Sequence, residues 1–442
     1  MSLTVEITGL AYGGNGIGRI DNKVVFVPFT APGDVAEVEI IEDKSDFSIA
    51  KLIGLKEPSK MRTSPPCPVY TVCGGCQLQH IEYVHQVNLK EKIFLETFQR
   101  LAKIDLAPIL RPSLPSPKPF NYRSRVRFHR NGLKWGFFKP NSHSIVEIED
   151  CPLLEPLLNS TLQALKTTDF PDTLYGAEVS LDKESGKTVA AFYVSKDTPF
   201  NWHAAINKIP VIKGFEVWLK DPFKRGKGRM AASSEDTAVS YNVMGFIVSS
   251  GVSSFSQANL FQNERLAEAV AEFSGLTKEE DAFDLFCGAG NFTFPLAGKA
   301  RKVYASDINA AAIKNARQNA LRNNISNVEF SVESSGRPQG RGDPCTHNSL
   351  TTAYGKQAMG AIDSSCRPQS NLEKHRPFVV ILDPPRGGAF ETIKKLPGLD
   401  AEKIVYVSCA PPTMARDCAF LVKHGYTPDF ALAVDMFPQT YH

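Results

Sequence analysis

The carboxy-terminal part of the chain is constrained most by its alternation of short apolar runs with amphipathic, helix-like stretches. Strand followed by helix in this rhythm is typical of a parallel, doubly wound α/β sheet of Rossmann-like type. A run rich in Gly, Ser, Pro and Thr interrupts the rhythm, and we expect it to be a mobile insertion. The apolar runs occupy residues 282–286, 302–306, 328–332, 378–383 and 403–408, and the insertion occupies 333–375.

The first loop of this region has the composition of a nucleotide-binding turn. In AFDLFCGAGNFTFPLA, Gly288 and Gly290 allow the backbone to approach a ligand closely. Asp307 ends the next apolar run, where its carboxylate can accept hydrogen bonds from ribose hydroxyls. No Lys-Ser or Lys-Thr pair follows and the full G-x-G-x-x-G is absent, which argues against ATP and dinucleotides.

Residues 1–250 have different patterns. Residues 5–55 alternate apolar and polar residues between Gly and Pro turns, which predicts a small antiparallel β-barrel, either of the oligonucleotide-binding type or purely structural. A Pro-rich linker, a cysteine cluster, a helix near 84–102 and a β-rich block to about 242 follow. We therefore predict three domains: a barrel at 1–57, a central α+β domain at 58–250 and the doubly wound domain at 251–442.

Composition excludes several classes of protein. The net charge of +3 is too small for a polybasic protein, and no apolar run approaches the roughly 20 residues of a membrane helix. The amino terminus lacks the pattern of a signal peptide, so we expect a cytoplasmic protein that does not contact membranes. Nine cysteines in such a chain indicate metal ligation or catalysis rather than disulfides.

A cysteine cluster follows the linker. Cys67, Cys73 and Cys76 form a C-x5-C-x2-C array around Gly74 and Gly75, and such tight spacing lets several thiolates bind one metal centre. Cys151 is the nearest candidate for a fourth ligand. The spacing suits an iron-sulfur cluster or a structural zinc equally, and independent core cysteines are a third reading.

A basic patch lies between residues 106 and 146, a stretch without a single Asp or Glu. In FNYRSRVRFHR, strand alternation would place Arg123, Arg125 and Arg127 on one face, toward the phosphates of a nucleic acid, and Arg130 belongs to the same patch. The interleaved aromatic residues could stack on unpaired bases. An ordinary solvated face is the alternative.

Two chemically active residues follow the last apolar runs. Asp383 begins a stiff Asp-Pro-Pro-Arg loop, and Cys409 follows KIVYVS. Because the carboxyl ends of parallel strands form the ligand-binding edge of an open sheet, both side chains should lie beside the ligand that the Gly-rich turn binds. Taken alone, a cysteine at a strand end is more often a packing residue.

Four segments together resemble one family, the RNA uracil-5-methyltransferases of the 23S rRNA type. GLAYGGNGIGRI is similar to the TRAM domain, CPVYTVCGGCQLQH to the family's iron-sulfur segment, the Gly-rich turn to class I methyltransferases, and VSCAPPTMARD to the nucleophile motif. The resemblance implies S-adenosylmethionine as cofactor and a four-iron, four-sulfur cluster bound by the four cysteines named above. It implies that the cofactor is bound by Gln257, Phe286, Gly288, Asn291, Asp307 and Asp383.

The resemblance also implies a mechanism in which Cys409 is the nucleophile and Asp383 belongs to the catalytic site. Carbon 5 of uracil is too electron-poor to take a methyl group unaided, and thiolate addition at carbon 6 converts the ring into an enolate that can. A base then removes the carbon 5 proton and the thiol leaves. Ala410 replaces the family's Asn beside the nucleophile, so we expect looser positioning there.

The general base is expected beyond VDMFPQTYH. Relatives have a Glu two residues after the position of His442, so we expect the chain to be truncated, with methyl transfer followed by slow release of RNA. His442 could substitute for the Glu only if the terminus is ordered.

Barrel and cluster together favour 23S rRNA over tRNA as substrate, and we expect a monomer. The tRNA enzyme is the first alternative. A catalytically impaired RNA-binding protein that keeps the methyltransferase fold is the second.

Overall fold

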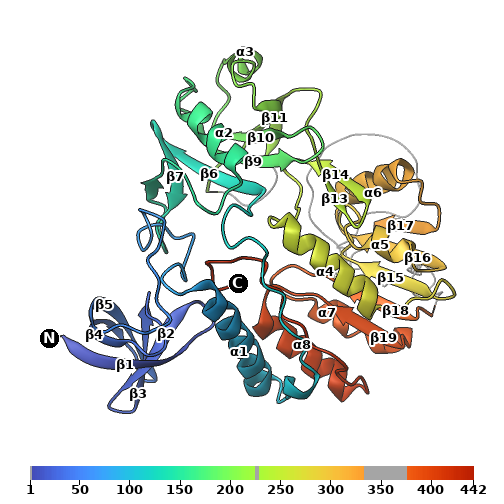
Figure 1. Cartoon of the computed structure of the whole chain (residues 1–442). Coiled ribbons are helices and arrows are strands. Elements are labelled where there is room, and N and C mark those ends of the chain that lie inside the picture. The colour runs from blue at the N-terminus through green and yellow to red at the C-terminus, as the bar shows by residue number, and fades with distance from the viewer. Residues whose placement is uncertain (1, 224–227, 333–375) are drawn as a thin grey trace, which may run out of the picture.

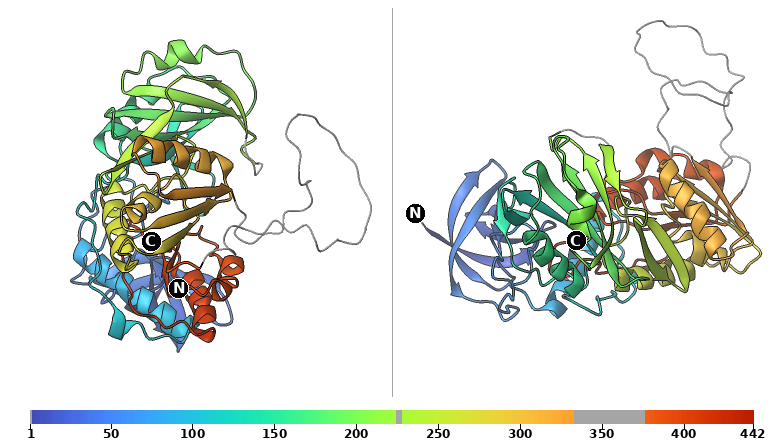
Figure 2. Two further views of the ribbon diagram at one scale, coloured as in Figure 1. Left: turned by 90° about the vertical axis from the view of Figure 1, so that its right-hand side faces the viewer. Right: turned by 90° about the horizontal axis from the view of Figure 1, so that it is seen from above.

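The computed structural model describes residues 2–223, 228–332 and 376–442. The predicted insertion at 333–375 therefore lies outside the described residues. The three predicted architectures are all present: a barrel, a central mixed sheet and a parallel sheet flanked by helices (Figure 1). Seen from above, the barrel and the parallel sheet lie on opposite sides of the molecule (Figure 2).

The amino-terminal barrel is closed, in the order β1-β2-β3-β5-β4. Alternate residues of its strands point inward, as their apolar–polar alternation predicts, and Val5, Ile7, Val25, Val27 and Val38 form its core. Its strands are β1 (Leu3–Leu10), β2 (Asn15–Ile20), β3 (Lys23–Pro28), β4 (Val35–Asp43) and β5 (Phe47–Glu57).

The central sheet has the order β12-β11-β10-β9-β6-β7-β8. Its strands are β6 (Arg125–Asn131), β7 (Lys134–Phe138), β8 (Ile145–Glu147), β9 (Leu174–Asp182), β10 (Lys187–Val194), β11 (Ile212–Leu219) and β12 (Arg229–Ser233). Two helices, α2 (Pro156–Lys166) and α3 (Trp202–Ile206), cover one side. The first helix of this domain is α1 (Tyr83–Leu101), which agrees with the predicted helix, and a short 3-10 turn follows at Ala107–Ile109.

The catalytic sheet is parallel throughout, in the order β17-β16-β15-β18-β19. Its strands are β15 (Asp281–Leu285), β16 (Lys302–Asp307), β17 (Val328–Val332), β18 (Val379–Leu382) and β19 (Lys403–Tyr406). The central strand β15 is buried along its whole length because helices cover both faces. The helices are α4 (Leu260–Phe273), α5 (Thr293–Ala297), α6 (Ala310–Arg322), α7 (Phe390–Ile393) and α8 (Pro411–Lys423), with a 3-10 turn at Leu396–Leu399.

Two elements of the predicted central domain pack on the catalytic core. The hairpin of β13 (Ala238–Val243) and β14 (Phe246–Gly251) contributes Val243 and Val248 to the core that includes Phe294. Helix α1 lies beside α8, where Phe98 packs with Ala415 (Figure 1). The boundary predicted at residue 250 therefore separates segments that share a core.

The carboxyl terminus lies in the centre of the molecule, where the three domains meet (Figure 1). The backbone N–H groups of Gln77 and Leu78, just after the cysteine cluster, both donate to the Gln439 carbonyl at 3.0 Å. The buried Gln86 side chain of α1 donates to the Gln439 side chain at 2.9 Å and accepts from its backbone N–H at 3.0 Å. These contacts order the segment up to His442.

Candidate active site

The Gly-rich turn after β15 has the backbone shape of a ligand-binding loop. Phe286 has a φ of 69°, unusual for a residue with a bulky side chain, and Gly288 and Gly290 also have positive φ. The Gly288 N–H donates to Asp307 Oδ2 at 3.0 Å, which joins the turn to the end of β16. A Cβ at Gly288 would meet nothing within 4 Å, so the backbone there borders open space.

A second carboxyl group lies beneath this turn. Asp284 is 1% exposed, its Oδ2 accepts from the Thr293 hydroxyl at 2.5 Å, and its Oδ1 has no partner among the described residues. Burial, together with the nearby carboxylates Asp383 and Asp307, raises the pKa of Asp284 to about 7, while the hydrogen bond from Thr293 opposes this shift. Burial likewise raises the pKa of Asp383 to about 7. These buried acids, one of which has an oxygen without a partner among the described residues, suit a ligand with a positive charge and ribose hydroxyls.

The raised pKa of Asp284 predicts a stability that depends on pH. The folded state holds a proton that the unfolded chain releases near pH 4, so this group destabilises the fold as pH rises from about 4 to 7. Replacing Asp284 by Asn should stabilise the ligand-free protein by roughly 2 to 4 kcal/mol above pH 7, with the gain vanishing near pH 4. Thermal unfolding midpoints of both proteins across that range measure it, and a gain independent of pH would contradict it.

Asn291 and Gln257, both predicted to bind the cofactor, have different surroundings. The Asn291 amide donates to Asn263 at 2.9 Å and accepts from Asn263 at 2.8 Å and from the Tyr241 hydroxyl at 3.0 Å. It therefore braces the turn against α4 and β13. Gln257 precedes α4 and lines the large cavity described below.

The loops that carry Asp383 and Cys409 are joined by the first turns of α8. Asp417 is fully buried, and its Oδ2 accepts from the Ala389 N–H at 3.0 Å and from the Tyr406 hydroxyl at 2.7 Å. The Thr413 hydroxyl donates to the Arg386 carbonyl at 3.2 Å. Because α8 begins directly after Cys409, these bonds fix the cysteine relative to the Asp383 loop.

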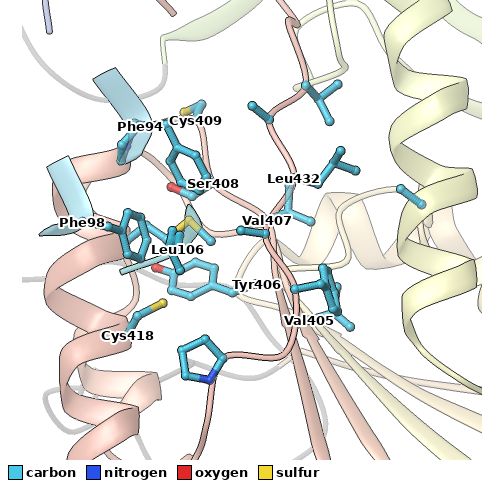
Figure 3. A pocket seen from close by; sticks show the side chains of 18 of the residues that line it. Phe94, Phe98, Leu106, Val405, Tyr406, Val407, Ser408, Cys409, Cys418 and Leu432 are labelled. Atoms are coloured by element: carbon cyan, nitrogen blue, oxygen red, sulfur yellow. The ribbon is translucent and has the colours of Figure 1, made fainter. Parts of the chain in front are cut away.

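Cys409 is exposed and lines a cavity of about 530 Å³ (Figure 3). Asp383 and Gln257 line the same cavity, so three of the predicted site residues lie around one space. The cavity extends away from Cys409 along β19 to an apolar end, where Phe98, Leu106 and Cys418 project into it (Figure 3). Phe286, Gly288, Asn291 and Asp307 lie outside the residues that line it.

Three further residues line the cavity. The sequence patterns do not single out two of them, Tyr12 and Tyr441, and they give His442 a role only if the terminus is ordered. Tyr12 comes from the barrel, and Tyr441 and His442 come from the carboxy-terminal segment. Burial, with the positive charges of Arg386 and Lys90 nearby, lowers the pKa of His442 to about 4. The imidazole is therefore neutral at pH 7, and its buried Nδ1 has no partner among the described residues.

The four predicted metal ligands converge. Burial is the main cause that raises the pKa of Cys76. The nearby thiols Cys67, Cys73 and Cys151 add to this shift, so that the pKa reaches about 12. Burial raises the pKa of Cys151 to about 11, and Arg123 opposes this shift. In the described ranges, no group of three or more Cys, His, Asp or Glu side chains is arranged so that it could hold a metal ion. The mutual effects on pKa place the four thiols near one another, and four thiols have the chemistry of a metal centre's ligands, although their arrangement here is not that of a metal site.

The arginines of the basic patch differ in their exposure and in the groups of the protein that they already contact. Arg123, Arg125 and Arg127 alternate with buried residues as predicted, but Arg125 pairs with Glu178 at 2.6 Å. Arg127 is exposed and lies over the Tyr193 ring at 4.6 Å. Arg130 is only 6% exposed and donates to the carbonyls of residues 170, 171 and 174. Its guanidinium is used inside the protein, which does not fit a role in RNA contact.

No helix in the ranges that the structure describes is both long and apolar enough to span a membrane.

Comparison with protein families gives two matches. Residues 2–53 match the TRAM domain, and residues 112–341 match the family described as tRNA (uracil-5-)-methyltransferase. The chain is 31% identical to a 23S rRNA (uracil(1939)-C(5))-methyltransferase, RlmD, of Methylococcus capsulatus, over all of this chain and 95% of the relative. RlmD of Pectobacterium atrosepticum is also 31% identical, over all of this chain and 92% of the relative.

One solved structure resembles the whole chain. It is the tRNA (uracil-54, C5)-methyltransferase of Pyrococcus abyssi in complex with S-adenosyl-L-homocysteine, with a TM-score of 0.73 and 23% identity, covering 100% of this chain and 98% of that one. At this identity the likeness shows the fold of the chain.

Proposed function

The chain belongs to the family of tRNA and rRNA uracil-5-methyltransferases that carry a TRAM domain, and from this premise we propose that it methylates carbon 5 of a uridine in 23S rRNA through a covalent bond to Cys409. As a member of this family it is an S-adenosylmethionine-dependent RNA methyltransferase. The rRNA substrate is supported by the RlmD relatives, which align over the whole chain.

One observation carries the proposed mechanism. The thiol of Cys409 is exposed at the carboxyl edge of a parallel sheet, in the same cavity as Asp383 and Gln257. Ligands of open α/β sheets bind at that edge. A packing cysteine would be buried among apolar side chains instead, as Cys287 is, 4% exposed beside Ala305 and Ile313.

The chemistry assigned to Cys409 is nucleophilic catalysis. Its Sγ adds to carbon 6 of the uracil, the ring electrons move to carbon 5, and carbon 5 takes the methyl group. A base then removes the carbon 5 proton, the carbon 5–carbon 6 double bond forms again and the Cys409 thiolate leaves. The neutral imidazole of His442 lies in the same cavity and can accept this proton.

The methyl donor site is assigned to the residues of the Gly-rich turn and its neighbours. S-Adenosylmethionine supplies a methyl group activated by its positively charged sulfur. Asp307 is placed at the end of β16 to bind ribose hydroxyls, and Gly288 leaves open space for the ligand. The acids Asp284 and Asp383, whose pKa values burial raises, favour a cationic ligand.

We also propose that Cys67, Cys73, Cys76 and Cys151 hold an iron-sulfur cluster that stabilises the fold. The convergence of these four thiols supports it, and the Gly75 N–H donates to Cys73 Sγ at 3.4 Å, a contact that suits a ligating sulfur. The residues directly after the cluster bind Gln439. The cluster would therefore position the segment that carries Tyr441 and His442.

RNA contact is assigned to the barrel and to the exposed part of the basic patch. Replacing Arg127 by Ala should weaken RNA binding about 3- to 10-fold and reduce the salt dependence by about one phosphate contact. Filter binding at several salt concentrations measures both. Arg301→Ala is the control, because Arg301 is also exposed but precedes β16, at the amino edge of the parallel sheet and outside the basic patch. Equal losses in both variants would contradict the assignment.

The proposed function is tested by methylating protein-free 23S rRNA and unmodified tRNA in parallel with methyl-labelled S-adenosylmethionine. We expect label in the 23S rRNA, recovered as 5-methyluridine after digestion to nucleosides. Label confined to tRNA would contradict the rRNA assignment. Binding of both RNAs without any label would indicate a binding protein that keeps the fold.

A further inference from the structure

A turn of the barrel reaches the reactive end of the cavity. Tyr12 lies between β1 and β2, and its turn is closed by bonds from the Ala11 N–H to the Asn15 carbonyl at 2.8 Å and from Gly14 to Ala11 at 3.0 Å. Gly13 and Gly14 both have φ in the left-handed region, which residues with side chains rarely adopt. The shape of this turn is therefore fixed, and Tyr12 is held at its tip.

The same turn is docked tightly against two other segments. A Cβ on Gly14 would lie 2.9 Å from the Cβ of Gln77 and 3.3 Å from the Cβ of Tyr441, so only glycine allows this approach. Gln77 is in turn bonded to Gln439. The barrel, the segment after the cysteine cluster and the carboxy-terminal segment thus meet at one point beside Cys409.

A contact within the protein fixes the orientation of the Tyr12 ring but leaves part of the side chain exposed. Its edge packs on the Tyr441 ring at 85°, with centroids 5.5 Å apart, which fixes the plane of the ring. The side chain remains 38% exposed and lines the cavity together with Cys409 and Asp383. Among the described residues, nothing forms a hydrogen bond with its hydroxyl.

The electrostatics agree with this placement. Burial raises the pKa of Tyr12, and the nearby ionisable groups Tyr441 and Cys409 add to this shift, while Arg386 opposes it. A tyrosine from the first twelve residues therefore lies near Cys409, which is close to the other end of the chain. Its ring is uncharged at neutral pH and is available for stacking.

We propose that Tyr12 forms one wall of the pocket for the target nucleotide and stacks on a base of the RNA while the uracil is attached to Cys409. The inference rests on the proposed function and deepens it, because it gives the barrel a positioning role in the reaction besides RNA binding. An enzyme that acts on a ring carbon must hold the base outside its stack, and an aromatic side chain replaces the lost stacking. Tyr12 is the aromatic ring that the barrel places there.

The test compares single-turnover methylation of 23S rRNA by Tyr12 variants at saturating enzyme. Tyr12→Ala should lower the methyl-transfer rate roughly 10- to 100-fold, the effect of losing one base–aromatic stack. Tyr12→Phe should stay within about 3-fold of the wild type, because the flat ring is retained. RNA affinity should change little in either variant, since most contacts lie elsewhere.

Ile53→Ala is the matched control, an exposed apolar residue of the same barrel that does not line the cavity, and its rate should be unchanged. Tyr12→Leu, which keeps bulk without a flat ring, should be as slow as Tyr12→Ala and is measured in case the alanine variant is unstable. A wild-type rate in the Ala and Leu variants would overturn the inference alone. A Tyr12→Phe variant as slow as Tyr12→Ala would overturn stacking as the role. A wild-type protein that transfers no methyl group would overturn the proposed function and the inference with it.

Discussion

Replacing Cys409 by Ala is expected to abolish methyl transfer, lowering the single-turnover rate by about 10,000-fold or more, because carbon 5 of uracil is not activated without a thiolate at carbon 6. RNA binding should remain close to that of the wild type, since Cys409 is exposed and supports no buried contact. Methyl transfer from labelled S-adenosylmethionine, measured at saturating enzyme, gives the rate.

The matched control for this variant is Cys418→Ala. Cys418 lies on α8, nine residues further along, and burial raises the pKa of its thiol to about 12, so it remains protonated and cannot attack. We expect Cys418→Ala to methylate RNA at nearly the wild-type rate. A Cys409→Ala variant that keeps a tenth of the activity would rule out the covalent mechanism.

Replacing Cys76 by Ser is expected to remove the metal centre and to lower the unfolding midpoint by roughly 10 °C or more, because metal binding at such sites is coupled to folding. Cys76 is the most informative of the four positions, because all three other thiols raise the pKa of its thiol. Iron and acid-labile sulfide in the purified protein, together with the melting curve, measure the effect.

Two possible results would contradict different parts of this assignment, the kind of metal centre and the site itself. One zinc ion and no sulfide in the wild-type protein would contradict the iron-sulfur assignment while retaining the four thiolate ligands. A Cys76→Ser protein with unchanged metal content and stability would contradict the site itself. Cys418→Ala, which removes a thiol from outside the cluster, is again the control.

The catalytic domain was the most predictable part of the fold. Its central apolar runs, β15 and β18, are strands with both faces buried, and consecutive strands in such a sheet are joined locally by helices, so the pattern lies within short windows of sequence. The prediction of a parallel, doubly wound sheet is confirmed, and Cys409 lies at its carboxyl edge as expected. The closed barrel is confirmed for the same reason, because strand alternation is a local signal.

The parts that sequence patterns missed depend on contacts between distant segments. Nothing near Tyr12 indicates that it meets Tyr441, more than four hundred residues later. Arg125 looks like an RNA contact until β9 places Glu178 beside it, and Arg130 points inward because the strand alternation puts it on the other face from Arg127. The contacts of Tyr12 and Arg125 join segments far apart in the sequence, for which single-sequence patterns have no periodicity, whereas the inward position of Arg130 follows from the alternation of its own strand.

The covalent role of Cys409 is tested most directly by trapping. RNA that contains 5-fluorouridine at the target cannot lose a proton from carbon 5, so the adduct should remain after methyl transfer. Trypsin and nuclease digestion should then give the peptide 404–416, IVYVSCAPPTMAR, whose single cysteine is Cys409, carrying a methylated fluorouridine nucleotide detectable by mass spectrometry. An adduct on any other cysteine, or no adduct from protein that methylates ordinary RNA, would contradict the account.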